Sequence, residues 1–508
     1  METRTPEEEE EEEEEKKRSK AKAENNNLNE KNSTAMTIDF PDEILHHIFS
    51  FLPIKSLTQT TLLSKHWNRL SLWRTHPHLI FPHISPYYEA TGLVPTVLSR
   101  RQPESKITTF RLSGYISSSC LRDCIDRVMY CRIEQLELGV NLDCSFDLPM
   151  RLFRCSTLRV LTLNHQDRRN LDGRHFSLTV PREGFGLAPT DLHTAVHTLS
   201  LTNIYLVEGS DFFLGGNFPF LRKLCLKNVR GMIGCHLNIK CPCLEDLKLD
   251  GLEMKELDVS GVRLLELELK RLDMTHSVKI FAPSLRSLHW ENHANVEITA
   301  ESFKCLNKGF ICFLYEPGSA ARLQGAFIFL CAIRFARSIC FGSQALEILA
   351  KIDRAGGLPC SFNNLRTLDL ETDMRKLEIE GIVCLLRSSP ILHTITIDST
   401  SWLNSENATS KEERYLESQK QTFKSLEHHL KVVRIHIQNT RMLTRVHKSA
   451  ANLVRFFLQH GRVLQEMTVT LKSRRGDRRI LQPSIRSRMM KFPRASSNVK
   501  ISLVYWRE

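Results

Sequence analysis

The chain has 508 residues, of which 41% are hydrophobic, so it holds enough apolar side chains for large cores and is not wholly disordered. This length corresponds, as a soft prior, to about three domains of roughly 150 residues each. The net charge is +12, but nine acids form a single run at residues 7–15, so the rest of the chain is more basic than this figure indicates. The balance permits an acidic partner without proving one, because net charge affects association rather than fold.

No apolar stretch approaches the roughly 20 residues that span a bilayer. The longest candidate, residues 326–333, is flanked by Arg322 and Arg334, and the polyglutamate run near the N-terminus is the opposite of a signal peptide. We therefore expect neither a membrane protein nor a secreted one. The 15 scattered cysteines are typical of reduced intracellular thiols, and none shows the spacing of a zinc site, so we expect no metal and no cofactor.

Residues 1–36 contain the glutamate run, a basic cluster at residues 16–20 and a stretch rich in Asn, Lys and Glu. They hold almost nothing that could be buried, which predicts a disordered charged tail. The basic cluster fits a nuclear-import signal and equally fits a solvated charge run.

From Phe40 the composition changes and apolar residues recur at helical spacing. Pro41 suits a first helical turn, and Pro53 ends the helix. A second apolar series follows, which predicts two or three short helices within roughly 45 residues, near the lower limit for independent stability. The apolar residues outnumber what so small a core can hide, so some face a partner unless the module is simply a self-contained helical mini-domain.

Three runs, Phe40-Pro41-Asp42-Glu43-Ile44-Leu45, Phe51-Leu52-Pro53 and Leu63-Ser64-Lys65-x-Trp67, followed by Trp73 and Pro77-x-Leu79, resemble the plant-type F-box over residues 38–81. Phe40 stands where that family usually has Leu, and His66 where it usually has Arg. The resemblance implies helices that dock in an apolar groove of a Skp-family adaptor and, through it, reach a cullin. The residues implied for adaptor binding and its support are Pro41, Ile44, Leu45, Ile48, Leu52, Leu57, Leu62, Leu63, Ser64 and Trp67.

From about residue 130 the pattern L-x-x-L-x-L recurs with apolar substitutions. Copies start at residues 133, 158, 196, 221, 244, 264, 285, 365 and 392, and a further copy fits at 336. The five starts from 196 to 285 are 25, 23, 20 and 21 residues apart, which is the period of leucine-rich repeats. No single repeat can bury its leucines alone. An α/β domain with a few Leu-rich strands would not explain this period, so we predict an α/β fold with a curved solenoid and a parallel sheet over residues 110–400.

Residues 401–428 are polar and predict a connector. A strand from Leu430 to Ile437, a helix at 449–458 and a strand at 463–471 follow, in an order that resembles the FBD domain of many plant F-box proteins. The predicted organisation is therefore a tail (1–36), an F-box (37–83), a linker (84–109), the repeats, the connector, and a small α+β FBD-like region with a basic tail (429–508).

The chain contains no phosphate loop, H-E-x-x-H, nucleophile elbow or dinucleotide-binding motif, so we expect no catalytic residues. What remains is binding chemistry. In each repeat the residue between the last two leucines points away from the core, and neighbouring strands lie about 5 Å apart. Four such residues in the compact run of repeats predict a substrate-binding strip: Cys225, Lys248, Glu268 and His289. For any single position, a merely solvated side chain is the alternative.

Two functions are consistent with these features. The resemblance implies a non-enzymatic substrate-recognition subunit of an SCF-type (Skp–cullin–F-box) E3 ubiquitin ligase, acting in the nucleus and/or the cytoplasm on a protein substrate held by the repeats. The alternative is a nucleic-acid-associated scaffold that uses its basic termini, motivated by nine Lys and Arg against one Asp at residues 472–494. That segment lacks interleaved aromatic residues apart from Phe492, so the sequence favours a protein partner over nucleic acid.

Overall fold

The computed structural model describes most of the chain, which divides into two compact units, Met1–His76 and Pro77–Glu508. The described residues are 41–49, 51–52, 54–60, 62–63, 67, 72–84, 92–102, 105–166, 176–179, 194–208, 212–231, 236–272, 275, 277–293, 297–298, 302–314, 320–358, 360–399, 414–416, 418, 423–438, 446–473 and 489–507. The predicted tail of residues 1–36, much of the predicted connector and most of the basic segment at 472–494 lie outside these ranges.

The first unit is built from short helices, namely α2 (Asp42–Phe49), α3 (Ile54–Thr60) and the 3-10 helix η1 (Leu72–Arg74). α2 begins directly after Pro41, whose carbonyl oxygen accepts hydrogen bonds from the amides of Ile44 (2.9 Å) and Leu45 (3.1 Å). Asp42 and Glu43 lie in the first turn, where carboxylates interact favourably with the positive end of the helix.

Four apolar side chains form the small core of this unit. Leu45 and Phe49 lie one turn apart on α2, and both are at most 6% exposed. Ile54 and Leu57 of α3 are at most 2% exposed. The edge of the Trp67 ring packs on Phe49, with ring centroids 5.2 Å apart. One side of each helix is therefore buried within the unit.

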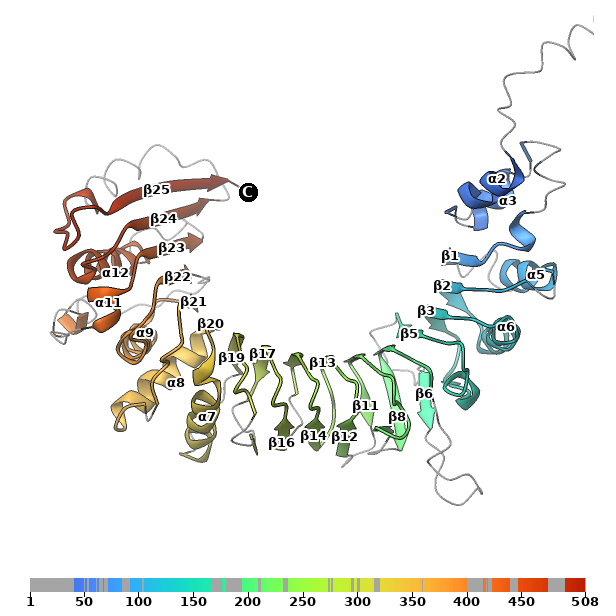
Figure 1. Ribbon diagram of the computed structural model, residues 1–508, viewed down its shortest axis with the longest axis horizontal. Coiled ribbons are helices and arrows are strands. Elements are labelled where there is room, and N and C mark those ends of the chain that lie inside the picture. The colour runs from blue at the N-terminus through green and yellow to red at the C-terminus, as the bar shows by residue number, and fades with distance from the viewer. Residues whose placement is uncertain are drawn as a thin grey trace, which may run out of the picture. The chain divides into compact units, whose positions relative to one another are not determined.

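In the described part of the second unit, sixteen strands form one continuous parallel sheet whose spatial order follows the chain (Figure 1). They are β1 (His78–Ile84), β2 (Thr109–Ile116), β3 (Gln135–Leu142), β5 (Val160–His165), β7 (Thr198–Thr202), β10 (Lys223–Lys227), β13 (Asp246–Asp250), β15 (Glu266–Lys270), β17 (Ser287–Asn292), β19 (Lys308–Phe313), β20 (Ser338–Phe341), β21 (Thr367–Thr372), β22 (Thr394–Ser399), β23 (Val432–Gln438), β24 (Glu466–Ser473) and β25 (Lys500–Arg507).

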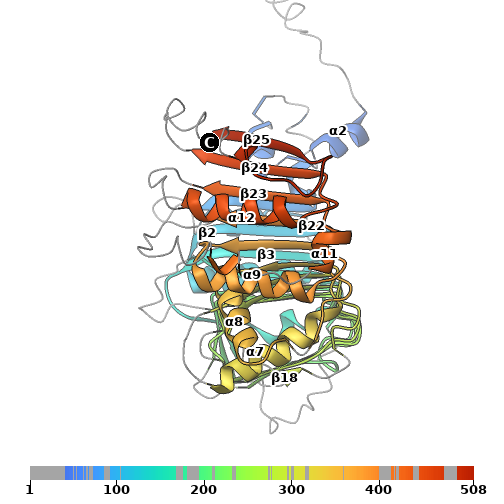
Figure 2. The same ribbon diagram turned by 90° about the vertical axis from the view of Figure 1, so that its left-hand side faces the viewer.

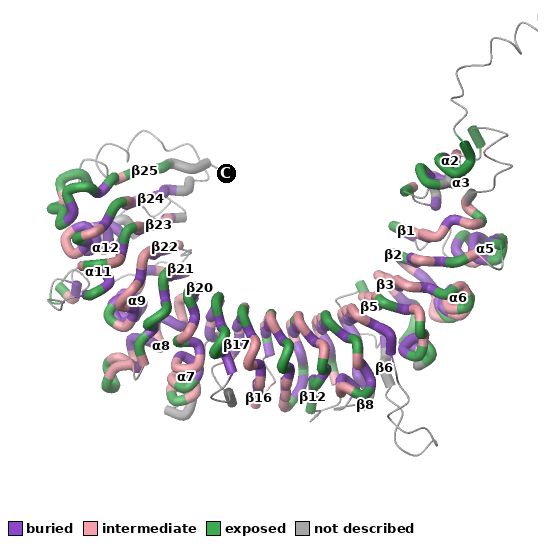
Figure 3. The backbone as a smooth tube through the Cα atoms, in the orientation of Figure 1, coloured by how far each residue is buried: buried purple, intermediate pink, exposed green. Residues whose placement is uncertain are grey.

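The repeated leucines stack on one another from strand to strand. Leu224 pairs in register with Leu247, and Leu247 pairs with Leu267. All three are at most 2% exposed. Buried and partly exposed residues alternate along these strands, as Figure 3 shows, because successive side chains of a strand point to opposite faces. One face of the sheet therefore forms the core, and the other lines the inner side of the curve.

The outer side of the second unit is covered by helices at both ends and by short strands in the middle (Figures 1 and 2). The helices are α5 (Leu93–Ser99), α6 (Ser118–Tyr130), α7 (Ala320–Ala332), α8 (Ser343–Arg354), α9 (Lys376–Ser388), α11 (Lys424–His428) and α12 (Val446–His460), with 3-10 helices η2 (Met150–Leu152) and η4 (Ile333–Phe335). The outer strands are β4 (Phe146–Asp147), β6 (Phe176–Thr179), β8 (Ile204–Glu208), β9 (Phe213–Leu214), β11 (Arg230–Gly231), β12 (His236–Lys240), β14 (Glu256–Ser260), β16 (Ser277–Phe281) and β18 (Glu297–Ile298). The shortest repeats return through strands, since they lack the residues for a helical crossover.

The predicted parallel sheet is confirmed. Each of the nine L-x-x-L-x-L copies supplies a main-sheet strand, and the copy at residue 336 is β20. The sequence reading missed β19, where Gly309 stands in the place of a leucine, as well as β1, β2 and β25 at the ends of the sheet. A glycine leaves the backbone pairing intact but removes the side chain on which the pattern depends.

Two predicted boundaries differ from the structure. β1 begins inside the range 37–83 assigned to the F-box, yet it pairs with β2 (His78 with Thr109) in the second unit. α5 lies inside the predicted linker. At the other end, β23, β24 and β25 continue the main sheet. The FBD-like region is therefore the end of the solenoid rather than a separate sheet, because its strands hydrogen-bond to the last repeat.

α8 and α9 approach each other closely at Gly381. A Cβ atom placed on this residue would overlap the carbonyl oxygen of Leu346 on α8 and lie 3.0 Å from the Leu346 Cα. Backbone atoms cannot move aside as a flexible side chain can. The contact between the two helices therefore requires glycine at this position.

We expect Gly381→Ala to lower the stability of the chain by about 1–3 kcal/mol, the usual effect of overpacking a core. Thermal unfolding followed by circular dichroism measures the change as a lower Tm. Gly92→Ala is the control, since a Cβ atom there would meet nothing within 4 Å. A Tm that Gly381→Ala leaves unchanged would contradict the close packing of α8 on α9.

Glu378, in the first turn of α9, is a fully buried carboxylate. Its Oε2 accepts hydrogen bonds from the Thr372 hydroxyl (2.6 Å) and from the Arg375 amide (3.3 Å). Burial raises the pKa of Glu378 to about 7, although these two hydrogen bonds lower it. The folded chain therefore holds the Glu378 proton more tightly than the unfolded chain does.

Because this pKa is raised on folding, the contribution of Glu378 to stability falls as pH rises from about 4.5 to about 7 and is constant above that range. Glu378→Gln removes the titrating group and keeps a carbonyl oxygen that accepts from Thr372 and Arg375. We expect the Tm of this variant, relative to wild type, to increase between about pH 5 and about pH 8. A difference that stays constant over that range would show that Glu378 is ionised at both ends of it.

Candidate functional site

The first unit carries large apolar side chains that its own core does not bury. Ile44 and Ile48 lie one turn apart on α2 and are 44% and 45% exposed. Phe51, directly after this helix, is 75% exposed, and Leu62 and Leu63, after α3, are 85% and 76% exposed. We call these five residues the apolar face. An exposed group of this kind on a small unit indicates a protein partner.

The structure divides the predicted adaptor-binding residues into two groups. Leu45 and Leu57 belong to the internal core, and Trp67 is partly buried against Phe49. The residues that reach the surface, fully or in part, are Pro41, Ile44, Ile48, Leu52, Leu62 and Leu63. Ser64 lies outside the described residues. The predicted set does not include Phe51, which lies two positions beyond the end of α2 and is exposed.

On the inner side of the second unit, one residue from each main strand forms a row in register. The predicted strip is part of this row, with Cys225 paired to Lys248, Lys248 to Glu268, and Glu268 to His289. The members from β2 to β25 are Arg111, Glu137, Thr162, Ser200, Cys225, Lys248, Glu268, His289, Phe310, Cys340, Asp369, Thr396, Arg434, Thr468 and Ser502. We call it the central row.

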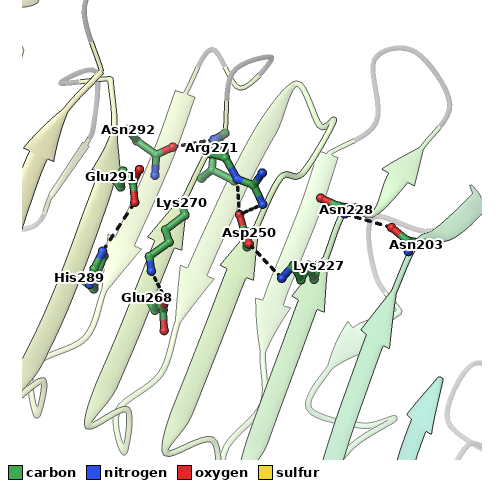
Figure 4. Close-up of polar contacts among 11 residues, drawn as sticks. Asn203, Lys227, Asn228, Asp250, Glu268, Lys270, Arg271, His289, Glu291 and Asn292 are labelled. Atoms are coloured by element: carbon green, nitrogen blue, oxygen red, sulfur yellow. Dashed lines mark hydrogen bonds and ion pairs between the residues drawn. The ribbon is translucent and has the colours of Figure 1, made fainter. Parts of the chain in front are cut away.

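Charges within the strip interact across strands. Lys248 Nζ lies 3.9 Å from Glu268 Oε2. Lys270 Nζ lies 2.6 Å from Glu268 Oε1, as Figure 4 shows. Burial raises the pKa of Glu268, but the hydrogen bond from Lys270 and the neighbouring cations outweigh it, so this pKa is lowered. Burial also raises the pKa of the Cys225 thiol, which is therefore protonated at neutral pH.

His289 stacks on Phe310 of the next strand, with ring centroids 4.2 Å apart and an angle of 19° between the ring planes. Burial and the cation of Lys270 lower the pKa of His289, so its imidazole is neutral at neutral pH. Phe310 is the aromatic member that the sequence reading missed, because β19 lacks the leucine pattern. The stack gives the central row an aromatic point between Glu268 and Cys340.

Polar side chains at the carboxyl ends of the central strands fix the turns that follow (Figure 4). Asn228 Nδ2 donates to Asn203 Oδ1 (3.0 Å), and both residues adopt positive φ. In the next repeat Gly251 has a φ of +68°, and a Cβ atom there would lie 2.7 Å from Asn228 Oδ1. Arg271 Nε donates to Asp250 Oδ1 (2.7 Å) in the following step. These contacts support the strands and leave the central row accessible.

Neither metal nor membrane chemistry is evident in the part of the chain that the structure describes. Within it, no three His, Cys, Asp or Glu side chains are grouped so as to hold a metal ion. Among the described helices, none combines the length and apolarity that a membrane crossing requires. The described cysteines are free thiols, and burial raises the pKa of several of them, including Cys124 and Cys241.

Known proteins resemble this chain over most of its length. The family described as F-box-like matches residues 38–76, which end where the first compact unit ends. An F-box/FBD/LRR-repeat protein of Arabidopsis thaliana is 28% identical over 495 residues, covering 91% of this chain and 94% of that protein. An F-box protein of the same plant is 30% identical over 217 residues, covering 40% of this chain and 67% of that protein.

Among solved structures, the crystal structure of the TLR13–ssRNA13 complex aligns at a TM-score of 0.37 with 12% identity, over 84% of this chain and 66% of that chain. That similarity is too low to support an argument. The helical first unit, the leucine-stacked sheet and the two plant relatives agree with one another. The chain belongs to the plant F-box/leucine-rich-repeat proteins and ends in an FBD-type region.

Proposed function

We propose that this chain is the substrate-recognition subunit of an SCF-type E3 ubiquitin ligase, which binds a Skp-family adaptor through its first unit. The apolar face carries this proposal, since an F-box unit with five large exposed apolar side chains fits the groove of a helical partner. Through the adaptor the chain would reach a cullin. The compartment that we propose is the nucleus or the cytoplasm, which imaging of a tagged chain tests.

The catalytic contribution that we propose is positional. The chain would hold a substrate near a separate enzyme that transfers ubiquitin, which raises the effective concentration of the two reactants. Its own side chains would then take no part in bond formation. This fits a chain in which no catalytic motif is found in the sequence.

The second unit is the part that we propose binds the protein substrate. Its central row mixes acids, cations, small polar residues and the stack of His289 on Phe310. Nucleic-acid tracks instead combine cations with several stacking aromatic residues. A mixed row of this kind supports a protein partner, and the sixteen-strand sheet offers a long surface for it.

The apolar face is tested by Ile44→Asp together with Ile48→Asp. Both side chains are exposed, so the unit should stay folded, whereas burying two carboxylates against an apolar groove costs several kcal/mol. We expect the double variant to lose co-purification of the Skp-family adaptor. Val262→Asp together with Ile328→Asp is the matched control, because it adds the same charges to exposed aliphatic positions of the second unit.

Leu57→Ala provides the contrasting case. This residue is fully buried, and removing it should destabilise the first unit by about 2–5 kcal/mol without changing the apolar face itself. Adaptor binding that survives the Ile44 and Ile48 changes would refute the assignment of the apolar face.

The strip is tested by Lys248→Glu and, separately, His289→Asp. An exposed ion pair such as that of Lys248 with Glu268 contributes at most about 1 kcal/mol, so we expect little change in Tm. Proximity labelling in cells should show loss of substrates from both variants, while the adaptor is still captured. Lys255→Glu is the control on the outer side, before β14. If all variants label the same proteins as wild type, the substrate does not contact this strip.

A further inference from the structure

A row of cations lies along the edge of the main sheet where strands β17 to β23 begin. Its members, which we call the basic ridge, are Arg286, Lys308, Arg337, Arg366 and Lys431. All five are exposed. The backbone aligns Arg337 with Arg366, since the Arg337 amide donates to Asn307 O (3.0 Å) and the Arg366 amide donates to Arg337 O (2.8 Å). On β19 this level is occupied by Asn307, and Lys308 lies one position further along the strand, paired with Ser287 and Ser338. His393 fills the corresponding place on β22.

The basic ridge is not neutralised within the described part of the chain. None of its five side chains makes an ion pair or a side-chain hydrogen bond with a described residue. Elsewhere on the sheet, charges on adjacent strands do pair. Arg111 Nε lies 2.5 Å from Glu137 Oε2, and Arg434 Nη2 lies 3.6 Å from Glu466 Oε2. The ridge therefore differs from these two pairs.

The two positions that start each strand from β17 to β23 contain no acid. The nearest strands on either side of the ridge do begin with an acid, Glu266 on β15 and Glu466 on β24. Neighbouring strands lie about 4.8 Å apart, so like charges at this spacing repel one another. This repulsion lowers the stability of the free protein, and an anionic partner would relieve it.

The opposite ends of the same strands are acidic. Glu291 of β17, Glu371 of β21 and Asp398 of β22 lie there, and Glu371 pairs in register with Asp398. Burial raises the pKa of Glu371, and so do the charges of Asp398 and Glu291. Five residues separate Arg366 from Glu371, which is about 17 Å along a strand. This part of the sheet therefore has cations where its strands begin and acids near their other ends.

We propose that the basic ridge binds an extended acidic segment of a protein partner, with Asp or Glu side chains over its cations. This inference rests on the proposed function, in which the second unit holds a protein, and it adds the charge of the segment that is held. A peptide is narrow enough to lie along the edge where the strands begin, away from the acids at the other strand ends.

The geometry sets the length of the segment. The ridge crosses from β17 to β23 in five strand-to-strand steps, a distance of about 24 Å. An extended chain advances about 3.3 Å per residue, so about eight residues span the ridge. Alternate side chains of such a peptide face the same way, which places an acid near most of the cations if every second residue is Asp or Glu.

The test measures binding of the full-length chain to a fluorescein-labelled peptide of about ten residues that alternates Glu and Ser. Wild type should bind it, and binding should weaken as salt rises, because the contacts are between exposed charges. Arg337→Glu together with Arg366→Glu should weaken binding by about tenfold or more at low salt. Arg159→Glu together with Arg222→Glu is the matched control, since these exposed residues directly precede β5 and β10 but lie outside the ridge.

The outcomes separate the possibilities. Loss of binding in the ridge variant, with binding retained in the control, supports the proposal. Equal binding by wild type and the ridge variant, equal loss in both variants, or no binding by wild type overturns it. Tighter binding of single-stranded oligothymidylate, lost in the ridge variant, would instead identify a nucleic-acid surface. Adaptor co-purification by the same variants reports on the proposed function separately, because neither pair of changes touches the apolar face.

Discussion

The second unit depends on the stacking of buried leucines between neighbouring parallel strands. Each repeat exposes a row of aliphatic side chains that only the next repeat can cover, as Leu224, Leu247 and Leu267 show by pairing in register. Since the backbone ladder and the leucine rows share one register, the outward residues are aligned as well. The central row and the basic ridge are thus both consequences of how the core is buried.

The first unit follows a different principle. It is so small that its helices bury only one side, with Leu45, Phe49, Ile54 and Leu57 inside, and the remaining apolar side chains stay at the surface. A partner groove would complete this unit, whereas the solenoid completes itself by repetition. The division at His76 therefore separates a small unit that leaves apolar side chains exposed from a repeat unit that buries its own leucines.

Electrostatic pairing varies along the inner face. In the first half of the sheet, charges on adjacent strands compensate one another, as Lys227 and Asp250 do at 3.9 Å. Between β17 and β23 the strands begin beside cations, whereas β17, β21 and β22 carry acids near their other ends. A surface divided in this way favours one orientation of a charged partner over its reverse, because the reverse orientation places like charges together.

The sequence by itself determined the short helices of the first unit, the repeat period and the parallel sheet, because each depends on local spacing of apolar residues that no distant contact alters. The F-box assignment came from the resemblance of its motifs to those of that family. It also placed Cys225, Lys248, Glu268 and His289 correctly in one row, since strand periodicity fixes which side chains point outward. Only the tertiary structure decided that Leu45 and Leu57 are internal while Ile44 and Ile48 are exposed, because both pairs fit the same helical spacing. Only the tertiary structure showed that β19 and the FBD-type strands belong to the main sheet, and that the residues of the basic ridge lie on successive strands. Consecutive cations of the ridge are 22 to 65 residues apart in the chain, and they come close only because the strands that follow them pair with one another.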